Sequence, residues 1–532
     1  MEMSSNSIRR ATAVEPTGIV RGCVSWLLEQ EETIRRILIL TFLYLFPVIW
    51  ILCPVVSDPD IWWHLQSGKW IVDHGQLPAT DPFSAFGDGK PWVAYSWLFE
   101  ISMYELVHIF GESGIFLYSL LGVWSTMLIL HRIIGTRCQD FFVSGILLTL
   151  SVVALSKLFT PRPWQLTMIF FAVTLHVVLS LREGRHAGWF WLLPIGYAIW
   201  ANTHVQFIYG LALLGLACTT PLIDRYIRPF SDRQAEMTWG SDHWKRLTIL
   251  TTLCALATLL TPYHVRLYSV VIELAAQTGM WEYTQEMQAP PFRGIADWAM
   301  LALFAAALIQ LGWRRTSSSF EIILLFAAAL SGFRGQRDVW FLVMACLAVI
   351  VSRPASAFSS VTSLVPRHGL VPTVVCVAIG LVGIVGYRDF SESSIRQNTA
   401  KLYPIEAASF LEQQGYAGSI YNHFNWGGYL IWRLPSLKVS MDGRANVHGD
   451  ARIKRSLATW DGRPEWKDDE DLRDAHVVIG ELSYPLMSIL RLDPRFRVIH
   501  EDKTAVIFAR VPQIDPSEMS VSGRYNTLAS AR

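Results

Sequence analysis

Long apolar runs alternate with short polar segments over most of the first 387 residues. A helix needs roughly 20 apolar residues to cross a bilayer core, and about 17 to 25 are tolerated. Runs that meet or nearly meet this length are 37–56, 115–134, 141–159, 164–181, 189–203, 206–223, 247–261, 296–312, 320–333, 338–352 and 370–387. The pattern predicts a polytopic α-helical membrane domain over 37–387 with about 11 spans.

Basic residues predict the orientation, because short cytoplasmic loops are enriched in arginine and lysine. They gather in the N-terminal segment 1–36 and in the connections 131–140, 182–186, 224–246, 313–319 and 353–368. No small-residue cleavage site follows the first apolar run, so 1–36 is interpreted as a cytoplasmic tail before an uncleaved span. We expect a multi-pass protein of the cytoplasmic (inner) membrane whose odd number of spans leaves the C-terminal part outside.

The stretch 94–111 is moderately apolar and has two interpretations. It carries Glu100, Glu105 and His108, which are costly in lipid. A helix lying at the outer interface keeps every basic connection on the cytoplasmic side. A true span would invert everything after it and would put the basic connections that follow on the wrong side. We therefore expect an outer loop over 57–114 that contains an interfacial helix.

From residue 388 the pattern becomes that of a soluble domain, which we place at 388–511. PIEAASFLEQQ has helical spacing, and five segments have the composition of short strands. They are SIYNHFNWGGYLIW, LKVSMDG, AHVVIGEL, FRVIHED and TAVIFARV. Apolar strands alternating with helical stretches predict a small α/β domain. The GG within the first strand is interpreted as a turn or bulge, and 512–532 as a flexible tail.

Composition agrees with a membrane protein and excludes some partners. Of the 532 residues, 52% are hydrophobic and 17% charged, and the mean hydropathy is +0.31. A net charge of +1 indicates no nucleic-acid partner. Six of the seven cysteines lie in or beside apolar segments, which argues against a disulfide framework or a zinc site.

Two acids directly follow the first apolar run. A carboxylate at the mouth of a membrane cavity can take a proton from a hydroxyl nucleophile, and partial desolvation raises its basicity. Asp58 and Asp60 are also close enough to share a divalent cation, the one cofactor that the sequence suggests. Alternatively, Asp58 caps a helix that opens at Pro59. Asp60 lies further in and is the better candidate for a base.

The predicted outer side carries arginines that the positive-inside bias would otherwise remove, and three of them are candidate phosphate ligands. Arg334 and Arg337 stand three apart around Gly335, and Arg162 lies between two prolines in TPRPW. Such guanidinium groups can clamp a phosphate or diphosphate. The structural alternatives are snorkelling to lipid headgroups or pairing with Asp338.

Other outer-side candidates have strong structural alternatives. Trp62 and Trp63 can stack on a sugar ring or anchor the chain at the interface, and His64 follows them. His204 lies at a helix end, where packing is the usual role. Lys90 contacts a phosphate or is solvated.

These features resemble the GT-C class of membrane glycosyltransferases, which use polyprenyl-phosphate sugars. The class includes protein mannosyltransferases and the aminoarabinose and galacturonic-acid transferases of lipid A. The resemblance rests on an acidic motif after the first span (Asp58, Asp60), a long outer loop with amphipathic helices, the Lys90–Pro91 pair and an aromatic helix ending in Phe110–Gly111. It covers roughly 37–352, and it is architectural more than motif-exact.

The resemblance implies that Asp60 or Asp58 is the base, and that Lys90 and the arginines hold the lipid phosphate. The chain departs from the class where Arg162 replaces an acid near the outer end of a later span, and where DPD replaces the common Asp-Glu. The C-terminal segments FNWGGYLIW and MDGRANVHG resemble the tail of a group of bacterial membrane proteins that share the DPDIWWHL loop.

Our hypothesis is an enzyme that moves a sugar from a polyprenyl-phosphate donor to an extracytoplasmic acceptor hydroxyl. The absence of a nucleotide-binding fingerprint favours a lipid-linked donor. The expected partners are this donor, membrane lipids, and a glycan, lipid or protein acceptor. The alternative is a non-catalytic protein that binds, assembles or transports lipid-linked glycans. Transporters usually show paired discontinuous helices in repeated halves, and no such pair is apparent here.

Overall fold

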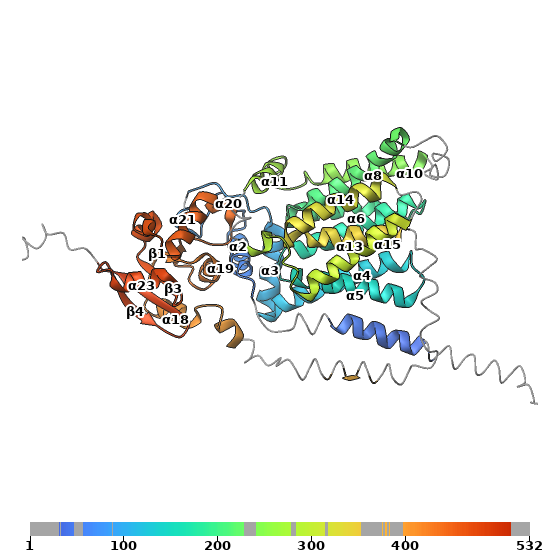
Figure 1. Cartoon of the computed structure of the whole chain (residues 1–532). Helices are drawn as coiled ribbons and strands as arrows, with labels where there is room; N and C mark the ends of the chain where they lie inside the picture. The colour runs from blue at the N-terminus through green and yellow to red at the C-terminus, as the bar shows by residue number, and fades with distance from the viewer. Residues whose placement is uncertain are drawn as a thin grey trace, which may run out of the picture.

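The computed structural model describes residues 31, 33–46, 57–87, 89–227, 241–277, 284–313, 318–352, 375, 378–379, 382 and 397–511. Within them, a bundle of apolar helices is joined to a C-terminal domain built on a sheet (Figure 1). Residues 1–30 of the N-terminal tail, the second half of the first predicted span, nearly all of the last one and the tail after 511 lie outside the described residues.

The helices of the bundle follow the predicted apolar runs. They are α4 (Ser113–Gly135), α5 (Phe141–Leu155), α6 (Trp164–Arg182), α7 (Leu193–Thr203), α8 (Phe207–Ile227), α10 (Ser241–Ala257), α13 (Ile295–Trp313), α14 (Ser319–Arg334) and α15 (Val339–Val351). Among the described residues, five segments are long and apolar enough to cross a membrane: Ser113–Gly135, Phe141–Leu158, Trp164–Arg182, Phe207–Asp224 and Ile295–Trp313. The protein is therefore a helical membrane protein, but the expected number of about 11 spans is not confirmed.

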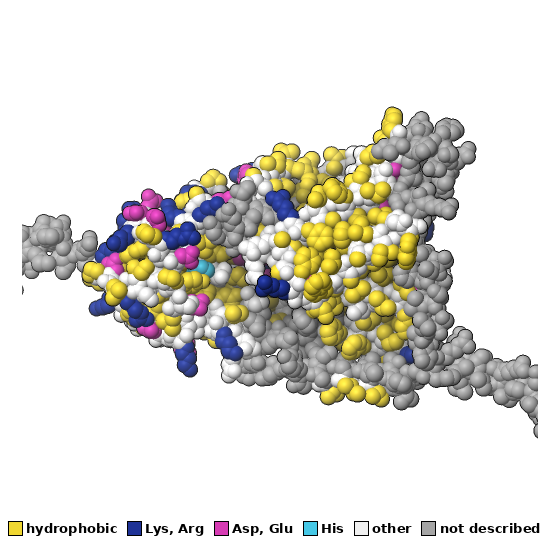
Figure 2. All heavy atoms as spheres, in the orientation of Figure 1, with side chains coloured by type: hydrophobic (Ala, Val, Ile, Leu, Met, Phe, Trp, Pro, Cys, Tyr) yellow, Lys and Arg dark blue, Asp and Glu magenta, His cyan; other side chains and the backbone are white. Residues whose placement is uncertain are grey.

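The centre of the bundle is α15, in which every residue is buried. It packs against α13, α14, α5 and α6. A helix that is apolar all round is stable only inside a larger assembly of helices or in lipid. Figure 2 shows the complementary outer pattern, with apolar side chains over the helix bundle and most charged side chains over the C-terminal domain.

Polar residues define where several helices begin and break. Asp140 caps α5 by accepting hydrogen bonds from the backbone N–H groups of Phe142 and Val143, at 2.9 and 3.0 Å. The TPRPW segment separates α5 from α6, because proline removes a backbone donor and clashes within a helix. His204 has an extended backbone between α7 and α8. Both breaks lie at the same end of the bundle.

The opposite end of the bundle gathers the basic connections predicted to be cytoplasmic. Arg137 donates to Glu183 at 2.6 Å, and Arg182 donates to Ser318 at 2.9 Å. The backbone N–H of Ser319 donates to Asp224 at 3.2 Å. These contacts bring four connections together at one end of the bundle.

Helices α2 (Asp60–His74) and α3 (Trp97–Phe110) pack against each other at the end of the bundle that faces the C-terminal domain (Figure 1). Arg162 marks this end, because Asp58 contacts its side chain and Tyr118, in α4, donates to its carbonyl at 2.9 Å. The chain therefore reaches this end before α3 and is still there after it. This arrangement is compatible with the interfacial interpretation of 94–111, which stays a prediction.

The C-terminal domain holds a five-stranded sheet with the order β2-β1-β3-β5-β4. Its strands are β1 (Gly418–Asn422), β2 (Leu437–Val439), β3 (Val477–Glu481), β4 (Phe496–Glu501) and β5 (Ala505–Arg510). Its helices are α18 (Ile405–Gln413), α19 (Phe424–Arg433), α20 (Ala445–His448), α21 (Asp450–Trp460), α22 (Glu470–Asp474) and α23 (Pro485–Leu492). β1 is parallel to β2 and β3, whereas β5 is antiparallel to β3 and β4. The expected α/β domain is present.

One predicted strand is partly wrong. The segment SIYNHFNWGGYLIW is a strand only as far as Asn422, and α19 follows it. The glycines are not a bulge but the contact face of α19. An added Cβ at Gly427 would lie 1.9 Å from the carbonyl oxygen of Met441, and one at Gly428 would lie 2.4 Å from that of Pro59. Close helix packing therefore explains the pair.

The outer segment and the C-terminal domain share a sheet edge and an aromatic cluster. Val439 in β2 donates its backbone N–H to Phe83 at 3.2 Å, and Ala85 donates to Val439 at 3.0 Å. Trp62 makes edge contacts with Tyr403 and Tyr429, with ring centroids 5.7 and 5.4 Å apart. Residues from both parts of the chain thus form one core.

Candidate functional site

Asp58, Asp60 and Arg162 form an ion cluster where the outer segment meets the bundle. Arg162 Nε lies 2.5 Å from Asp58 Oδ2, and Arg162 Nη1 lies 2.6 Å from Asp60 Oδ2. Glu286 is a third acid, 3.5 Å from the same Nη1. The side chains of Asp60 and Arg162 are each 14% exposed. The structure therefore joins three predicted residues separated by about 100 positions, but it pairs Arg162 with carboxylates rather than leaving it for a phosphate.

The backbone explains the different roles of the two aspartates. Asp58 Oδ1 accepts the backbone N–H of Asp60 at 3.0 Å and so supports the start of α2. The helix begins at Asp60 and its N-cap residue is Pro59, so the start lies one position later than the capping alternative placed it. Asp60 opens α2, and its Oδ1 lies beside Gly443 of the C-terminal domain. An added Cβ at position 443 would be 1.8 Å from that oxygen. Glycine at 443 is therefore needed to let the domain approach Asp60.

The protonation of Asp60 is set by opposing influences. Burial raises the pKa of Asp60 to about 6, Arg162 opposes this rise, and the negative charges of Asp58 and Glu286 add to it. A carboxyl group with this pKa is mostly ionised at neutral pH and is more basic than an exposed aspartate. These are the properties of a general base.

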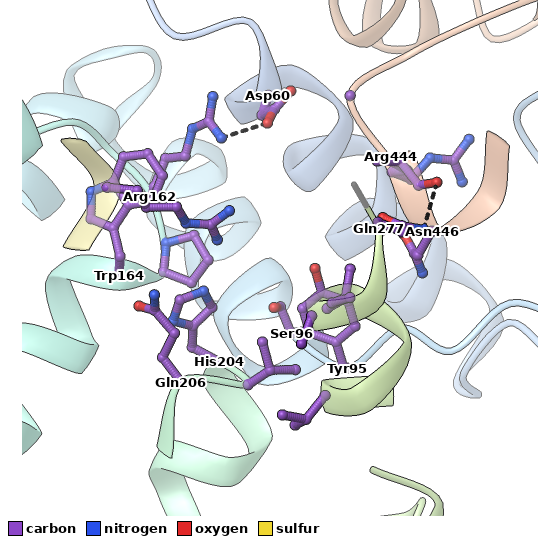
Figure 3. Close-up of a pocket in the computed structure, with 18 of the residues that line it drawn as sticks. Asp60, Tyr95, Ser96, Arg162, Trp164, His204, Gln206, Gln277, Arg444 and Asn446 are labelled. Carbon is purple, nitrogen blue, oxygen red and sulfur yellow. Dashed lines mark hydrogen bonds and ion pairs between the residues drawn. The ribbon is translucent and has the colours of Figure 1, made fainter. Parts of the chain in front are cut away.

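Asp60 and Arg162 line a cavity of about 490 Å³ at this end of the bundle, part of which is drawn in Figure 3. Its wall combines the outer segment, the breaks before α6 and α8, helix α11 (Arg266–Ala276), the end of α14 and the turn before α20. The predicted residues that line it are Asp60, Trp63, His64, Arg162, His204, Arg334 and Arg337. Other polar residues of the wall, among them Glu100, Glu286 and Arg444, were not predicted as site residues.

Arg337 is the predicted cation that the structure leaves available to a ligand. Within the described part of the chain it forms no hydrogen bond or ion pair, and its buried Nε has no partner. Its guanidinium lies 5.4 Å from the ring centroid of Trp164. The guanidinium of Arg162 lies 4.8 Å from the same centroid. A half-buried guanidinium without an acceptor is costly, and an anionic ligand would supply one.

His204 lines the cavity, whereas its neighbour Asn202 is structural. His204 is 2% exposed, and its Nδ1 lies 2.8 Å from the Thr167 hydroxyl. Asn202 accepts from Trp97 Nε1 at 2.8 Å and donates to the carbonyl of Leu260 at 2.8 Å. Asn202 therefore fastens α3 to the bundle.

Sequence reasoning missed the partner of His64. His64 Nδ1 lies 3.3 Å from Glu100 Oε1, and both side chains line the cavity. Burial raises the pKa of Glu100 to about 8 and lowers the pKa of His64 well below its usual value. The two groups form a neutral hydrogen bond at pH 7 rather than a salt bridge. The available signal was an acid within an apolar helix, which the sequence analysis used only to predict topology.

Two other predicted residues lie away from the cavity. Lys90 is exposed, and its Nζ lies 2.8 Å from the ring centroid of Phe86, outside the lining of the cavity. Trp62 is buried in the aromatic cluster with the C-terminal domain and is not in the lining of the cavity. Trp63, by contrast, is in the lining.

A buried ion network connects the outer segment to the C-terminal domain beside the cavity. Arg444 donates to Asp81 at 2.6 Å and to Asp442 at 2.7 Å, and His448 lies 3.1 Å from Asp442. Burial raises the pKa of Asp442, but Arg444 and His448 outweigh it and hold that pKa well below the usual range. In the MDGR turn, Asp442 and Arg444 thus form an ion pair around Gly443. Its link to Asp81 was not predictable from the sequence.

A second cavity, of about 780 Å³, adjoins the first. The two share Asp60, Arg162, Trp164, Glu286 and Gly443. The second is lined by Asp58 and by C-terminal residues that include Tyr403, His423, Asn425 and Tyr484. The Asp60–Arg162 ion pair thus stands between two spaces with different walls.

A divalent cation at the two aspartates would have to displace Arg162, which bridges both carboxylates. Within the described ranges, no group of three or more histidine, cysteine, aspartate or glutamate side chains is placed to hold a metal ion. Glu286, a further carboxylate, lies 3.5 Å from the same guanidinium.

No protein-family model matches the chain, and no curated protein matches it. Among solved structures it is similar to ArnT from Cupriavidus metallidurans bound to undecaprenyl phosphate, with 14% identity, 90% of this chain and 98% of that chain covered, and a TM-score of 0.46. The same protein in the apo state has 15% identity and a TM-score of 0.47, with 89% of this chain and 97% of that chain covered. The apo oligosaccharyltransferase from Archaeoglobus fulgidus has 9% identity and a TM-score of 0.49, with 84% of this chain and 69% of that chain covered.

These neighbours belong to the membrane glycosyltransferase class that the sequence resembles. All of the TM-scores are below 0.5 and the identities are 15% or lower. The argument for function therefore rests on the residues of the site.

Proposed function

We propose that this chain is a membrane glycosyltransferase that moves a sugar from a polyprenyl-phosphate donor to an acceptor hydroxyl. The observation that carries the proposal is the pairing, in one cavity, of a basic carboxylate at Asp60 with an unpaired guanidinium at Arg337. The first fits deprotonation of a hydroxyl, and the second fits a phosphate.

The wall of the cavity supports a lipid-linked donor. Val271 and Leu274 of α11, together with Ile208 and Tyr209 of α8, supply apolar surface on the same cavity as Arg337. A donor with a polyprenyl chain would place its tail along such a surface and its phosphate at Arg337. Arg334 lines the same region and adds positive charge.

The reaction balances with these groups. Asp60 accepts the proton of the acceptor hydroxyl, and that oxygen forms a bond to the anomeric carbon of the sugar. The bond from this carbon to the phosphate oxygen breaks, and the electron pair leaves with the polyprenyl phosphate. Arg337 offsets the charge that develops on the leaving phosphate. Attack opposite the leaving group inverts the anomeric configuration.

Arg162 has a different role in this proposal. It holds both aspartates and stacks against Trp164, so it orients Asp60 and limits the rise of its pKa. Without Arg162, two carboxylates would face each other across a buried space, and one would remain protonated at neutral pH. Arg162 is thus a positioning residue rather than a phosphate ligand.

The test compares chemistry with donor binding in the full-length protein in lipid nanodiscs. A panel of polyprenyl-phosphate sugars is supplied with a membrane-envelope extract as the source of acceptors, and released polyprenyl phosphate is measured. Asp60→Asn is expected to lower release by at least about 100-fold while polyprenyl phosphate still binds. Asp73→Asn, an exposed aspartate on the same helix, is the control and retains full release.

Arg337→Ala is expected to impair donor binding, which Asp60→Asn leaves intact. Loss of a charge-assisted contact should weaken polyprenyl-phosphate binding by roughly 10- to 100-fold. Arg266→Ala removes an exposed arginine outside the cavity and leaves binding unchanged. Full release by Asp60→Asn would eliminate Asp60 as the base. Donor binding without release for every sugar, in the unmodified protein, would favour the non-catalytic binding or transport alternative.

A further inference from the structure

The second cavity differs chemically from the first in its cations. Lys157 donates to Asp297 at 2.6 Å, and Lys401 donates to Asn398 at 3.2 Å. Arg162 is bound by Asp58 and Asp60. The described cations of this wall are therefore engaged, and the acids Glu286 and Glu481 also line it. Such a wall does not favour an anionic ligand.

The C-terminal side of the second cavity offers unsatisfied neutral hydrogen-bonding groups. The backbone N–H of Asn425 donates to His423 Nδ1 at 3.3 Å, so the proton of the imidazole is on Nε2. Burial lowers the pKa of His423 to about 4, which keeps the ring neutral. Among the described residues, neither this Nε2–H nor the side-chain amide of Asn425 has a hydrogen-bond partner.

Aromatic rings complete this wall. Tyr484 stacks on His423, with centroids 4.5 Å apart, and its hydroxyl lies 3.3 Å from His423 Nδ1. Tyr403 and Trp426 line the same cavity. Aromatic faces with a few neutral donors and acceptors suit the apolar faces and the hydroxyl groups of a sugar ring.

The position of the cavity decides which substrate it can hold. Asp60 is shared by both cavities, and the unpaired Arg337 lines only the first. If the donor phosphate occupies the first cavity, the acceptor can reach Asp60 through the second cavity. The segment from β1 into α19, which carries His423 and Asn425, is held on the outer segment by the close contact of Gly428 with Pro59.

We infer that the second cavity is the acceptor site, and that its C-terminal wall selects a neutral, hydroxyl-rich saccharide unit through His423, Asn425 and Tyr484. This inference rests on the proposed glycosyl transfer. The C-terminal domain thereby supplies acceptor specificity, while the bundle and the outer segment supply the donor site and the base.

The experiment uses the full-length protein in nanodiscs with a donor that it cleaves. Polyprenyl-phosphate release is measured without an acceptor and with methyl glycosides of glucose, mannose, galactose and N-acetylglucosamine as probes. At least one glycoside is expected to accelerate release. His423→Ala and Asn425→Ala should each raise the KM for that glycoside by roughly 5- to 10-fold. They should leave unchanged the slow release without acceptor and the binding of polyprenyl phosphate.

Controls separate this inference from the proposed function. His476→Ala alters an exposed histidine outside the cavity and should behave as the unmodified protein. Asn425 is itself exposed, so its variant is expected to fold. Release that no glycoside accelerates, or a KM that His423→Ala and Asn425→Ala change no more than His476→Ala, overturns the acceptor site without affecting the donor site. Acceleration by anionic phospholipid vesicles or by a serine-containing peptide, but not by glycosides, overturns the saccharide class. Absence of release under every condition overturns the proposed function itself.

Discussion

The carboxyl group of Asp60 is held between burial, which disfavours its charge, and the guanidinium of Arg162, which favours it. The result is a pKa of about 6 at a site where the proposed reaction needs the ionised form. The place of Asp60 after the first span led to the prediction that it is a base. The sequence did not reveal that Arg162 is the counter-ion of Asp60, because the two are about 100 residues apart and Arg162 was interpreted as a phosphate ligand.

This balance predicts the pH dependence of transfer. Only ionised Asp60 accepts a proton, so the rate should rise about tenfold per pH unit below about pH 6 and level off above it. The charge of Asp58 raises the pKa of Asp60, and removing that charge should lower the pKa. Asp58→Asn should therefore shift the profile to lower pH. Initial rates between about pH 4.5 and about pH 8 measure this shift. A shift to higher pH, or a profile independent of pH, would contradict the assignment.

At the scale of elements, α19 shows how packing overrides a local pattern. Alternating aromatic residues around GG suggested a strand, yet Phe424–Arg433 is a helix. Its glycine face lies against the start of α2, with Gly428 on the Pro59 carbonyl and beside Trp63. The contact needs two elements separated by more than 350 residues, so no local window in the sequence could reveal it.

Gly428→Ala tests this contact. An added methyl group would meet the Pro59 carbonyl at 2.4 Å, so α19 must move away from α2. We expect a cost of about 1 to 3 kcal/mol, a lower melting temperature and reduced transfer. Gly215→Ala is the matched control, because it adds the same methyl group to α8 in open space. Alanine there is helix-stabilising by roughly 0.5 to 1 kcal/mol. Equal melting temperatures for the two variants would show that the glycine contact is not needed for docking.

At the scale of the whole molecule, the polar residues separate into two ends. One end joins the basic connections through contacts such as Arg137 with Glu183, and the other holds the cavities and the C-terminal domain. The alternation of basic and non-basic connections predicted this division. Contacts of Asp58 and Tyr118 with Arg162 place the residues before and after α3 at the end that carries the site.

The orientation of these two ends in the membrane is a prediction that labelling can test. Glu465→Cys and His186→Cys place exposed thiols in the C-terminal domain and in a basic connection, respectively. In intact cells, a membrane-impermeant maleimide should label the first variant above the unmodified chain. The second should be labelled only after the cells are permeabilised. The opposite labelling pattern would place the proposed site on the cytoplasmic side.

The sequence by itself determined the apolar helices, the α/β C-terminal domain and several polar residues of the first cavity, among them Asp60, Arg162 and Arg337. These features follow from periodicity, hydropathy and charge, which are properties of neighbouring residues in the chain. Tertiary structure alone decided that Arg162 neutralises Asp58 and Asp60, that Arg337 is left unpaired, and that His423 and Asn425 face the same space as Asp60. Those outcomes depend on which distant groups satisfy one another after packing, because burial makes each unpaired charge or donor costly.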